Sequence, residues 1–338
     1  MNLKIMVIGF GIIGQGFAKV ILKKEDALKE KYGLEIKVVS ISDITGTLAD
    51  DDGVDLKEAL KTIQKNGKII AHPKATKMSG LDAIKSVDAD IVLEVTPTNI
   101  KTGEPGLSHM LAAMENKKHV VTSNKGPLAL EFKKLKEMAE KNDVEFKFEA
   151  SAGGAMPLIS LAKEALSGDQ VTAIKGILNG TTNYILSRMT KEGCSLDQAV
   201  KEAQELGIAE TDPSYDISGS DTASKLVILA NAIMGNDATY KDVKVQGISR
   251  ITPEAIKLAD EDEYVIKLIG EVRNDHLEVA PRLVPKNHPL NVDGTLNVAL
   301  LETDIAGEIT IVGRGAGAIP TNSAILSDII SIWGKRYR

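Results

Sequence analysis

The sequence predicts an α/β protein in which a doubly wound parallel sheet is followed by an α+β domain. Up to about residue 150, short apolar runs alternate with helical patterns, which is typical of right-handed βαβ units. Beyond that point helical runs come first and hairpin-like strands follow, which indicates a mixed or largely antiparallel sheet. A chain of 338 residues is long enough for two such domains.

The apolar runs of the first part predict buried parallel strands, because each run is short and nearly continuous. Helical patterns between them, including residues 12–26, 108–117 and 127–142, supply the crossovers. The strands are expected at residues 3–11, 35–43, 88–96, 117–125 and 143–151.

The second part begins with a Gly-Gly pair and a proline within residues 152–160, which indicates a hinge. We expect one domain of residues 1–150 plus 318–338 and a second domain of residues 151–317. The elements expected from here on are a strand at 171–179, helices near 181–191, 195–206 and 220–235, a hairpin of 264–273 and 276–285, strands at 296–304 and 308–315, and a helix at 321–334.

Charge and hydropathy exclude several classes of partner. The net charge is −6 and no long block of one sign occurs, so neither nucleic acid nor a membrane surface is expected as a partner. No apolar run reaches the roughly 18 residues of a membrane span, and the N-terminus carries no signal-peptide pattern. A cytoplasmic location is therefore expected.

The cysteine and histidine residues indicate neither a disulfide framework nor a transition-metal site. A single cysteine, Cys194, fits a reducing compartment and lies between two helical patterns with no histidine nearby in sequence. We expect it to be a structural thiol rather than a nucleophile. The five histidines are scattered and show no ligand spacing.

A glycine motif follows the first predicted strand and opens a helix, the context in which GxGxxG binds a dinucleotide. Its first glycine permits the tight turn, its second lets a pyrophosphate approach the backbone, and its third lets helix and strand pack closely. The motif predicts a Rossmann-type NAD(P)-binding domain, and its residues are Gly9, Phe10, Gly11, Ile12, Ile13 and Gly14.

The residue that ends the second predicted strand bears on the choice of cofactor. Asp43 follows the last glycine at more than the usual distance of about 20 residues, because the intervening helix and loop are long. Its carboxylate would accept a hydrogen bond from a ribose 2′-hydroxyl and would repel a 2′-phosphate. This favours NAD, although Lys57 or another lysine could serve NADP.

Polar residues also end the third and fourth strands, at the carboxyl edge of the sheet where ligands bind in open α/β folds. They are Thr96 and Pro97 on one strand, and Ser123 and Lys125 on the other. Lys125 is expected near the nicotinamide, and an ordinary surface lysine remains the alternative.

The stretch from Glu210 to Lys225 is rich in carboxylates and small residues. Asp221 and Lys225 stand four apart on a helix that Ser220 or Asp221 would cap, so they share one face. Such a pair suits binding a small zwitterion and moving a proton at an alcohol or carbonyl. A solvated loop with an ordinary helical ion pair is the alternative reading.

These segments together resemble homoserine dehydrogenase, in its short monofunctional form without an aspartate kinase domain or a C-terminal regulatory domain. The resemblance extends from Gly9 to about Ile330. It is carried by the residues at 203–225, by HVVTSNKGPLA at 119–129, by GILNGTTNYIL at 176–186 and by GRGAGAIPTNSAILSDI at 313–329.

The resemblance implies reversible NAD(P)H-dependent reduction of L-aspartate 4-semialdehyde to L-homoserine, on the way to threonine and methionine. It implies Lys225 as general acid/base with Asp221, and Lys125 beside them, with the division of roles between the two lysines open. It further implies that the enzyme is a homodimer through its β-rich region. By analogy Glu210 would bind the substrate ammonium, and Asp216, Gly180 and Thr181 would help to fix the substrate. A structural sodium ion would be held by Glu149 and the carbonyls of Ala152, Gly154 and Met156. The return to the cofactor domain would include Gly317.

Two other functions would share the glycine motif. Another amino-acid dehydrogenase, acting for example on aspartate, would not require the pair of Asp221 and Lys225. A nucleotide-sensing protein would keep the glycines and lose charge at Lys125, Asp221 or Lys225, and all three are present. An aldehyde dehydrogenase would need a thiolate for acylation, which Cys194 is not placed to supply.

Overall fold

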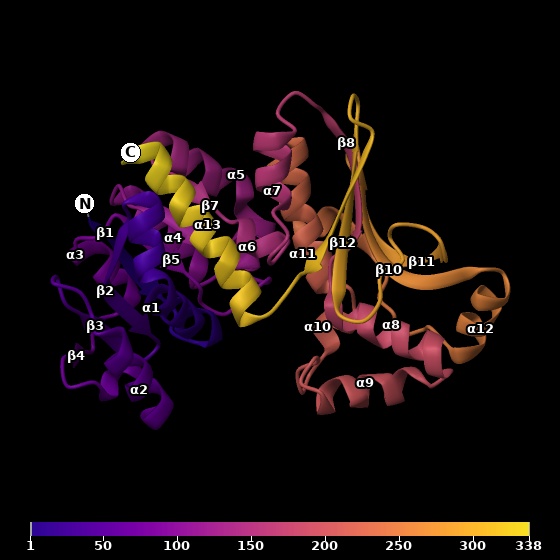
Figure 1. Ribbon diagram of the computed structural model, residues 1–338, viewed down its shortest axis with the longest axis horizontal. Coiled ribbons are helices and arrows are strands. Elements are labelled where there is room, and N and C mark those ends of the chain that lie inside the picture. Colours follow the sequence, from indigo (N-terminus) through magenta and orange to yellow (C-terminus); the bar gives the residue numbers. More distant parts are fainter. Residues whose placement is uncertain (1, 338) are drawn as a thin grey trace. The chain divides into compact units, whose positions relative to one another are not determined.

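The computed structural model describes residues 2–337. The chain forms two compact units, Met1–Ser151 with Ala318–Arg338, and Ala152–Gly317 (Figure 1). Because their relative placement is not determined, each unit is described by itself.

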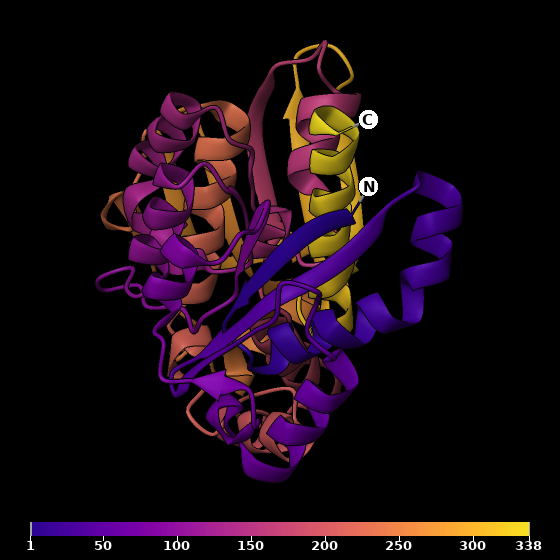
Figure 2. The same cartoon turned by 90° about the vertical axis from the view of Figure 1, so that its left-hand side faces the viewer.

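The first unit is built on a seven-stranded sheet of order β4-β3-β2-β1-β5-β6-β7, whose twisted strands are seen in Figure 2. Along this order, the strands β2, β1, β5, β6 and β7 pair in parallel. The strand β3 pairs antiparallel with both β2 and β4. The strands are β1 (Asn2–Ile8), β2 (Glu35–Asp43), β3 (Gly46–Ala49), β4 (Ala75–Thr76), β5 (Ile91–Glu94), β6 (His119–Thr122) and β7 (Phe146–Lys147).

The five predicted parallel strands are all present, and β3 and β4 are additions that the pattern did not predict. The change of direction between β2 and β5, on either side of β1, is the topological switch at which such sheets bind ligands. The helices are α1 (Ile12–Tyr32), α2 (Leu56–Asn66), α3 (Gly80–Ser86), α4 (Gly106–Glu115), α5 (Lys125–Asn142), α6 (Glu149–Ala152) and the C-terminal α13 (Ala318–Arg336), with the short 3-10 turn η1 (Ile69–Ala71).

The C-terminal helix α13 packs onto the first unit. Ile325, Ile329 and Ile332 are fully buried in the same apolar core as β1 and α1. Asn322 donates from Nδ2 to the carbonyl of Ile13, at 3.1 Å, close to the start of α1. Gly16 permits this approach, because a Cβ there would lie 2.5 Å from Asn322 Nδ2.

The second unit contains a six-stranded sheet of order β13-β12-β8-β10-β11-β9. Its pairs are antiparallel except β11 with β9. The strands are β8 (Val171–Ile177), β9 (Val243–Val245), β10 (Tyr264–Arg273), β11 (His276–Pro285), β12 (Leu296–Thr303) and β13 (Glu308–Arg314).

The predicted hairpin is present: Arg273 pairs with His276 across Asn274-Asp275, and Asn274 has φ +53°. The helices of this unit are α7 (Leu158–Ser160) continued by η2 (Leu161–Ala165), α8 (Gly180–Glu192), α9 (Leu196–Glu205), α10 (Ser214–Ile217), α11 (Ser220–Leu229) continued by η3 (Ala230–Met234), η4 (Tyr240–Asp242) and α12 (Pro253–Glu261). The prediction of an α/β fold with a doubly wound sheet and a second unit with a mixed sheet is confirmed.

Two further findings concern the chain as a whole. Within residues 2–337, no helix combines the length and apolar character needed to cross a membrane. Cys194 lies half-buried between α8 and α9 as a free thiol.

Candidate active site

The glycine motif joins β1 to α1 through a turn that side chains would obstruct. Gly9 has φ +102°, and a Cβ there would lie 2.7 Å from the carbonyl carbon of Val95. At Gly14 a Cβ would lie 2.2 Å from the carbonyl oxygen of Gly9. Gly9 therefore makes the turn and Gly14 lets the helix return close to it.

Gly11 differs from the other two glycines, because a Cβ there would meet no atom of the described chain within 4 Å. It occupies the N-cap of the 21-residue helix α1, where no side chain of the described residues caps the amides and no acid lies in the first turn. The exposed N–H groups and the positive end of the helix dipole suit an anionic group. The motif thus fits the pyrophosphate of a dinucleotide.

Asp43 ends β2 as predicted, but its carboxylate is already engaged in the protein. Oδ1 accepts from the amide and hydroxyl of Thr45, at 2.6 and 2.5 Å, and Oδ2 accepts from the amide of Ile69 at 2.7 Å. These bonds fix the β2–β3 turn and η1. Since a carboxylate oxygen has two lone pairs, Oδ2 retains capacity for one ribose hydroxyl, and that role stays a prediction.

The strand-end residues lie at the carboxyl edge of β5 and β6. Thr96 donates its amide to Glu94 Oε1 at 3.1 Å. Asn124 caps α5 by accepting from the amide of Gly126 at 3.2 Å, and it donates to Thr96 Oγ1 at 3.3 Å. Lys125 is the half-buried first residue of that helix. The loops that carry Thr96, Pro97, Ser123 and Lys125 are therefore joined by side-chain hydrogen bonds.

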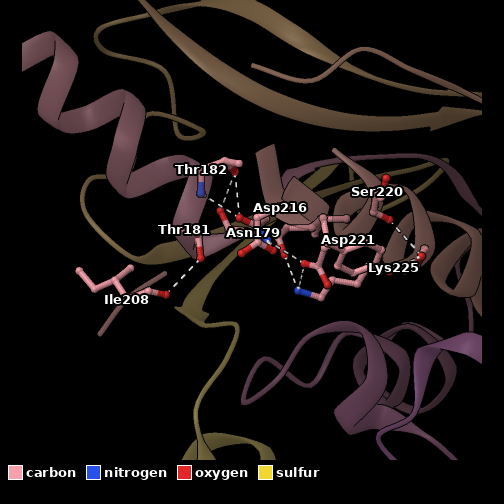
Figure 3. A network of polar contacts seen from close by, with 11 residues as sticks. Asn179, Thr181, Thr182, Ile208, Asp216, Ser220, Asp221 and Lys225 are labelled. Carbon is pink, nitrogen blue, oxygen red and sulfur yellow. Dashed lines mark hydrogen bonds and ion pairs between the residues drawn. The ribbon is translucent and has the colours of Figure 1, made fainter. Parts of the chain in front are cut away.

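The second unit holds a polar group that we call the carboxylate–lysine cluster: Asn179, Asp216, Asp221 and Lys225 (Figure 3). Asp216 is half-buried and the other three are buried. Asp221 and Lys225 lie on one face of α11, and Lys225 Nζ donates to Asp221 Oδ2 at 2.7 Å. Lys225 Nζ also donates to the carbonyl of Leu178 at 2.8 Å. Asn179 donates from Nδ2 to Asp216 Oδ1 at 2.7 Å and to Asp221 Oδ2 at 2.9 Å.

Burial makes the charges of this cluster strongly interdependent. The side chains of Lys225 and Asp221 are only 8% and 6% exposed. Burial, and next the charge of Asp221, raise the pKa of the Asp216 carboxyl, and hydrogen bonds from Asn179 and Thr181 and the charge of Lys225 offset this only in part. The cluster therefore carries two carboxylates against one cation, which suits capture of a cationic group from a ligand.

Local structure explains why these side chains meet. Asn179 is the N-cap of α8, where its Oδ1 accepts from the amide of Thr182 at 2.8 Å, and this fixes the direction of its Nδ2. Position 180, the next residue, has no room for a side chain, because a Cβ there would lie 2.7 Å from the carbonyl oxygen of Thr295. Gly180 meets this requirement. The predicted cap of α11 by Ser220 or Asp221 is wrong: Gly219 is the N-cap, with φ +84°.

Asn179 is the member of the cluster that sequence reasoning did not select. The motif of residues 179–183 predicts a helix start whose amides and hydroxyls could hold a carboxylate or a carbonyl, with an ordinary capped helix start as the alternative. Neither prediction selects the Asn179 side chain. Its second function, bridging Asp216 to Asp221, depends on a tertiary contact between α8, α10 and α11 that no local pattern indicates.

Other predicted substrate residues lie at the margin of this region. The Thr181 hydroxyl donates to the carbonyl of Ile208 at 3.3 Å (Figure 3). Glu210 is exposed, and its backbone carbonyl accepts from Gln204 Nε2 at 3.3 Å. The structure thus brings Asp216, Asp221 and Lys225 together and leaves the Glu210 side chain in solvent.

The candidate sodium ligands are distributed over both units. Glu149 is buried in the first unit, where its amide donates to Asp328 Oδ2 at 3.0 Å. Ala152, Gly154 and Met156 belong to the second unit, as does Gly317, which has φ +117°. Among residues 2–337 no group of three or more His, Cys, Asp or Glu could hold a metal ion, and backbone carbonyls are not included in that finding.

Comparison with known proteins gives the family. Residues 9–149 match the model described as the NAD-binding domain of homoserine dehydrogenase, and residues 157–330 match the model described as homoserine dehydrogenase. A homoserine dehydrogenase of Methanocaldococcus jannaschii is 58% identical over 332 residues, which cover 98% of each chain. The chain belongs to the homoserine dehydrogenase family.

Two further relatives agree with this assignment. An NAD(+)-dependent homoserine dehydrogenase of Pseudomonas canavaninivorans is 37% identical over 97% of this chain and 96% of that one. The crystal structure of a putative homoserine dehydrogenase from Archaeoglobus fulgidus has a TM-score of 0.91 at 44% identity, covering 98% of this chain and 99% of that chain. The predictions of an NAD(P)-dependent oxidoreductase and of the homoserine dehydrogenase family are confirmed.

Proposed function

We propose that the chain interconverts L-aspartate 4-semialdehyde and L-homoserine, with Lys225 as the general acid/base. The observation that carries this proposal is the geometry of Lys225, a buried ammonium held by Asp221 Oδ2 and the carbonyl of Leu178 at 2.7 and 2.8 Å. An ammonium has three N–H donors, so one remains for the oxygen of the substrate. In the reducing direction this donor protonates the carbonyl oxygen, and in the oxidising direction the neutral amine receives the proton.

The remaining members of the carboxylate–lysine cluster would orient the substrate and the lysine. Asp221 holds Lys225 and balances its charge, while Asn179 fixes Asp221 and Asp216 relative to each other. The resemblance assigns the substrate ammonium to Glu210, but the Glu210 side chain is exposed, so we assign the ammonium to Asp216 instead. Gly180 and Thr181, at the start of α8, would help to fix the substrate. Ionised Asp216 gains a cationic partner on binding, which would offset the burial that raises its pKa.

NAD(P), when bound, would supply or accept the hydride. Its pyrophosphate would be held by the amides at Gly11, Ile12 and Ile13, and its nicotinamide would lie near the loops of Thr96 and Lys125. We propose that Lys125 is a second cation at the reacting end and that Lys225 is the proton donor. The carboxylate of Asp43 supports a preference for NAD.

The finer assignments of assembly, location and metal are also proposals. The edge strand β13 and the adjoining turn expose Val312 and Ile305, at 49% and 76%, which supports a homodimer formed through the second unit. The free thiol of Cys194 fits the cytoplasm. Carboxylate and carbonyl oxygens of the kind offered by Glu149, Ala152, Gly154 and Met156 suit a hard cation such as sodium.

An assay of aspartate 4-semialdehyde reduction with NADH and NADPH in parallel tests substrate and cofactor together. We expect reduction of aspartate 4-semialdehyde, with a higher kcat/KM for NADH than for NADPH. No reaction is expected when pyruvate replaces the semialdehyde. Absence of turnover with either cofactor would contradict the proposed activity. A higher kcat/KM with NADPH would contradict only the proposed cofactor preference.

The cofactor preference can be changed beside Asp43 without touching it. Ile44 is fully exposed in the β2–β3 turn, so Ile44→Arg places a cation there and leaves the hydrogen bonds of Asp43 intact. We expect kcat/KM with NADPH to rise about tenfold relative to NADH, because one charged hydrogen bond is worth about 1.5–3 kcal/mol. Ile44→Gln is the uncharged control. An unchanged ratio in Ile44→Arg would show that the 2′ position is recognised elsewhere.

A further inference from the structure

Glu94 is a fully buried carboxyl group, with 0% exposure, that the proposed mechanism does not use. It is the last residue of β5, and it pairs in register with Ile8 at the end of β1 and with Thr122 at the end of β6. The loops that leave these three strands carry Gly9, Thr96 and Lys125. Glu94 therefore stands where the three loops assigned to the cofactor diverge.

One oxygen of Glu94 holds the loop of Thr96. Oε1 accepts from the Thr96 amide at 3.1 Å and also from the Thr96 hydroxyl. The backbone fixed in this way packs directly on the glycine motif, because a Cβ at Gly9 would lie only 2.8 Å from the Thr96 nitrogen. Displacement of Thr96 would thus also disturb Gly9.

Glu94 is linked to the loop of Lys125 through Thr122, by its backbone carbonyl, and through Thr96, by its carboxyl group. The Thr122 hydroxyl bonds to the carbonyl of Glu94 at 2.8 Å and lies 3.4 Å from Oε2. The same hydroxyl accepts from the Asn124 amide at 2.9 Å. Asn124 in turn holds Gly126, on the far side of Lys125. The carboxyl group itself reaches Asn124 through Thr96, because Asn124 Nδ2 donates to the Thr96 hydroxyl at 3.3 Å and that hydroxyl donates to Glu94 Oε1.

The packing around Glu94 leaves little room for rearrangement. A Cβ at Gly106 would lie 3.2 Å from Glu94 Oε2 and 2.5 Å from Asn124 Nδ2. His109 Nδ1 lies 3.7 Å from Oε1. A carboxyl group is costly to bury unless neighbouring groups donate hydrogen bonds to it. The donors to Glu94 are the amide and hydroxyl of Thr96 and the hydroxyl of Thr122.

We propose that Glu94 is a positioning residue that sets the relative placement of the glycine motif, Thr96 and Lys125, and hence the affinity for NAD(P). This inference rests on the proposed function, which assigns these loops to the cofactor. A glutamine has nearly the same shape, but it replaces one acceptor oxygen by an NH2 group and weakens the other. The fold would tolerate this exchange, but the hydrogen bonds from Thr96 to the carboxylate would be lost or weakened. The loops of Thr96 and Lys125 would then no longer be held in place by Glu94.

The test is a fluorescence titration of NADH into Glu94→Gln in the absence of substrate. We expect the Kd to rise about tenfold, as for loss of charged hydrogen bonds, and kcat to fall at least as far. The KM for homoserine should stay close to the wild-type value, because the carboxylate–lysine cluster is untouched. The midpoint of thermal unfolding should change little.

Glu145→Gln is the matched control. Glu145 is a buried carboxylate of the same unit, 8% exposed, next to His119 at the opposite edge of the sheet, and its partners are Lys335 and Arg336. We expect Glu145→Gln to lower the stability of the protein without weakening the binding of NADH. Wild-type NADH affinity in Glu94→Gln, or equal weakening in both variants, would overturn the proposal.

Thr122→Val provides a second variant if Glu94→Gln does not fold. It keeps the volume and removes the hydroxyl that links Glu94 to Asn124, so NADH binding should weaken by about threefold. Unchanged binding in this variant would also overturn the proposal. Since the titration needs no turnover, a wild type that failed to oxidise homoserine would contradict the proposed function and leave this result interpretable.

Discussion

Replacement of Lys225 by alanine is expected to reduce turnover by about a hundredfold or more, the typical loss when a general acid is removed. The affinity for NADH should remain within about twofold of the wild type, because the glycine motif belongs to the other unit. Steady-state kinetics together with an NADH titration separate the two quantities. Near-normal turnover would remove Lys225 from the proton transfer and make Lys125 the stronger candidate.

The same substitution should also lower the free energy of unfolding. Lys225 is the cation of a buried pair with Asp221, and removing one partner of a buried pair costs about 3–5 kcal/mol. The double variant Asp221→Asn with Lys225→Met keeps the volume and removes both charges. We expect it to recover much of the lost stability in denaturant unfolding and none of the activity. Recovery of activity with stability would mean that the pair is structural.

Replacement of Gly9 by alanine is expected to have the second large effect, on cofactor binding and on folding together. The φ of +102° is unfavourable for a residue with a Cβ, at about 1–3 kcal/mol, and that Cβ would overlap the backbone of Val95. The turn must therefore open, and NADH affinity should fall by more than about tenfold. Thermal unfolding and NADH titration measure the two consequences.

Gly11→Ala is the informative companion, because its Cβ would point into open space and its φ of −78° is ordinary. We expect wild-type stability with NADH affinity reduced by at least about tenfold, since the methyl group would stand where the pyrophosphate approaches. Wild-type affinity in Gly11→Ala would contradict the placement of the pyrophosphate at the start of α1.

The sequence predicted those parts of the fold that depend on long local patterns. The strands β1, β2, β5 and β6 are apolar runs bounded by turn residues, and they are present as expected. The strands β3 and β4 escaped prediction because they have only four and two residues and pair within one excursion from β2. Their formation depends on tertiary contacts, among them the bond from the Ile69 amide to Asp43.

In the candidate site, too, features set by local spacing were predicted and features set by tertiary contacts were not. The spacing of Asp221 and Lys225 was sufficient to predict their pairing on one helix face, which is present at 2.7 Å. Asn179 and Glu94 were not selected, because each becomes informative only when the partners that it joins are known. Glu210 was selected by resemblance, and its side chain lies in solvent, so its contact with a substrate stays a prediction.

The most direct test is the rate of homoserine-dependent NAD+ reduction by the wild type and by Lys225→Ala, measured side by side on preparations that bind NADH equally. The geometry of Lys225 with Asp221 and Leu178 predicts steady reduction by the wild type and a rate at least about a hundredfold lower in the variant. Equal rates from the two proteins would contradict the assignment of the carboxylate–lysine cluster as the site of proton transfer.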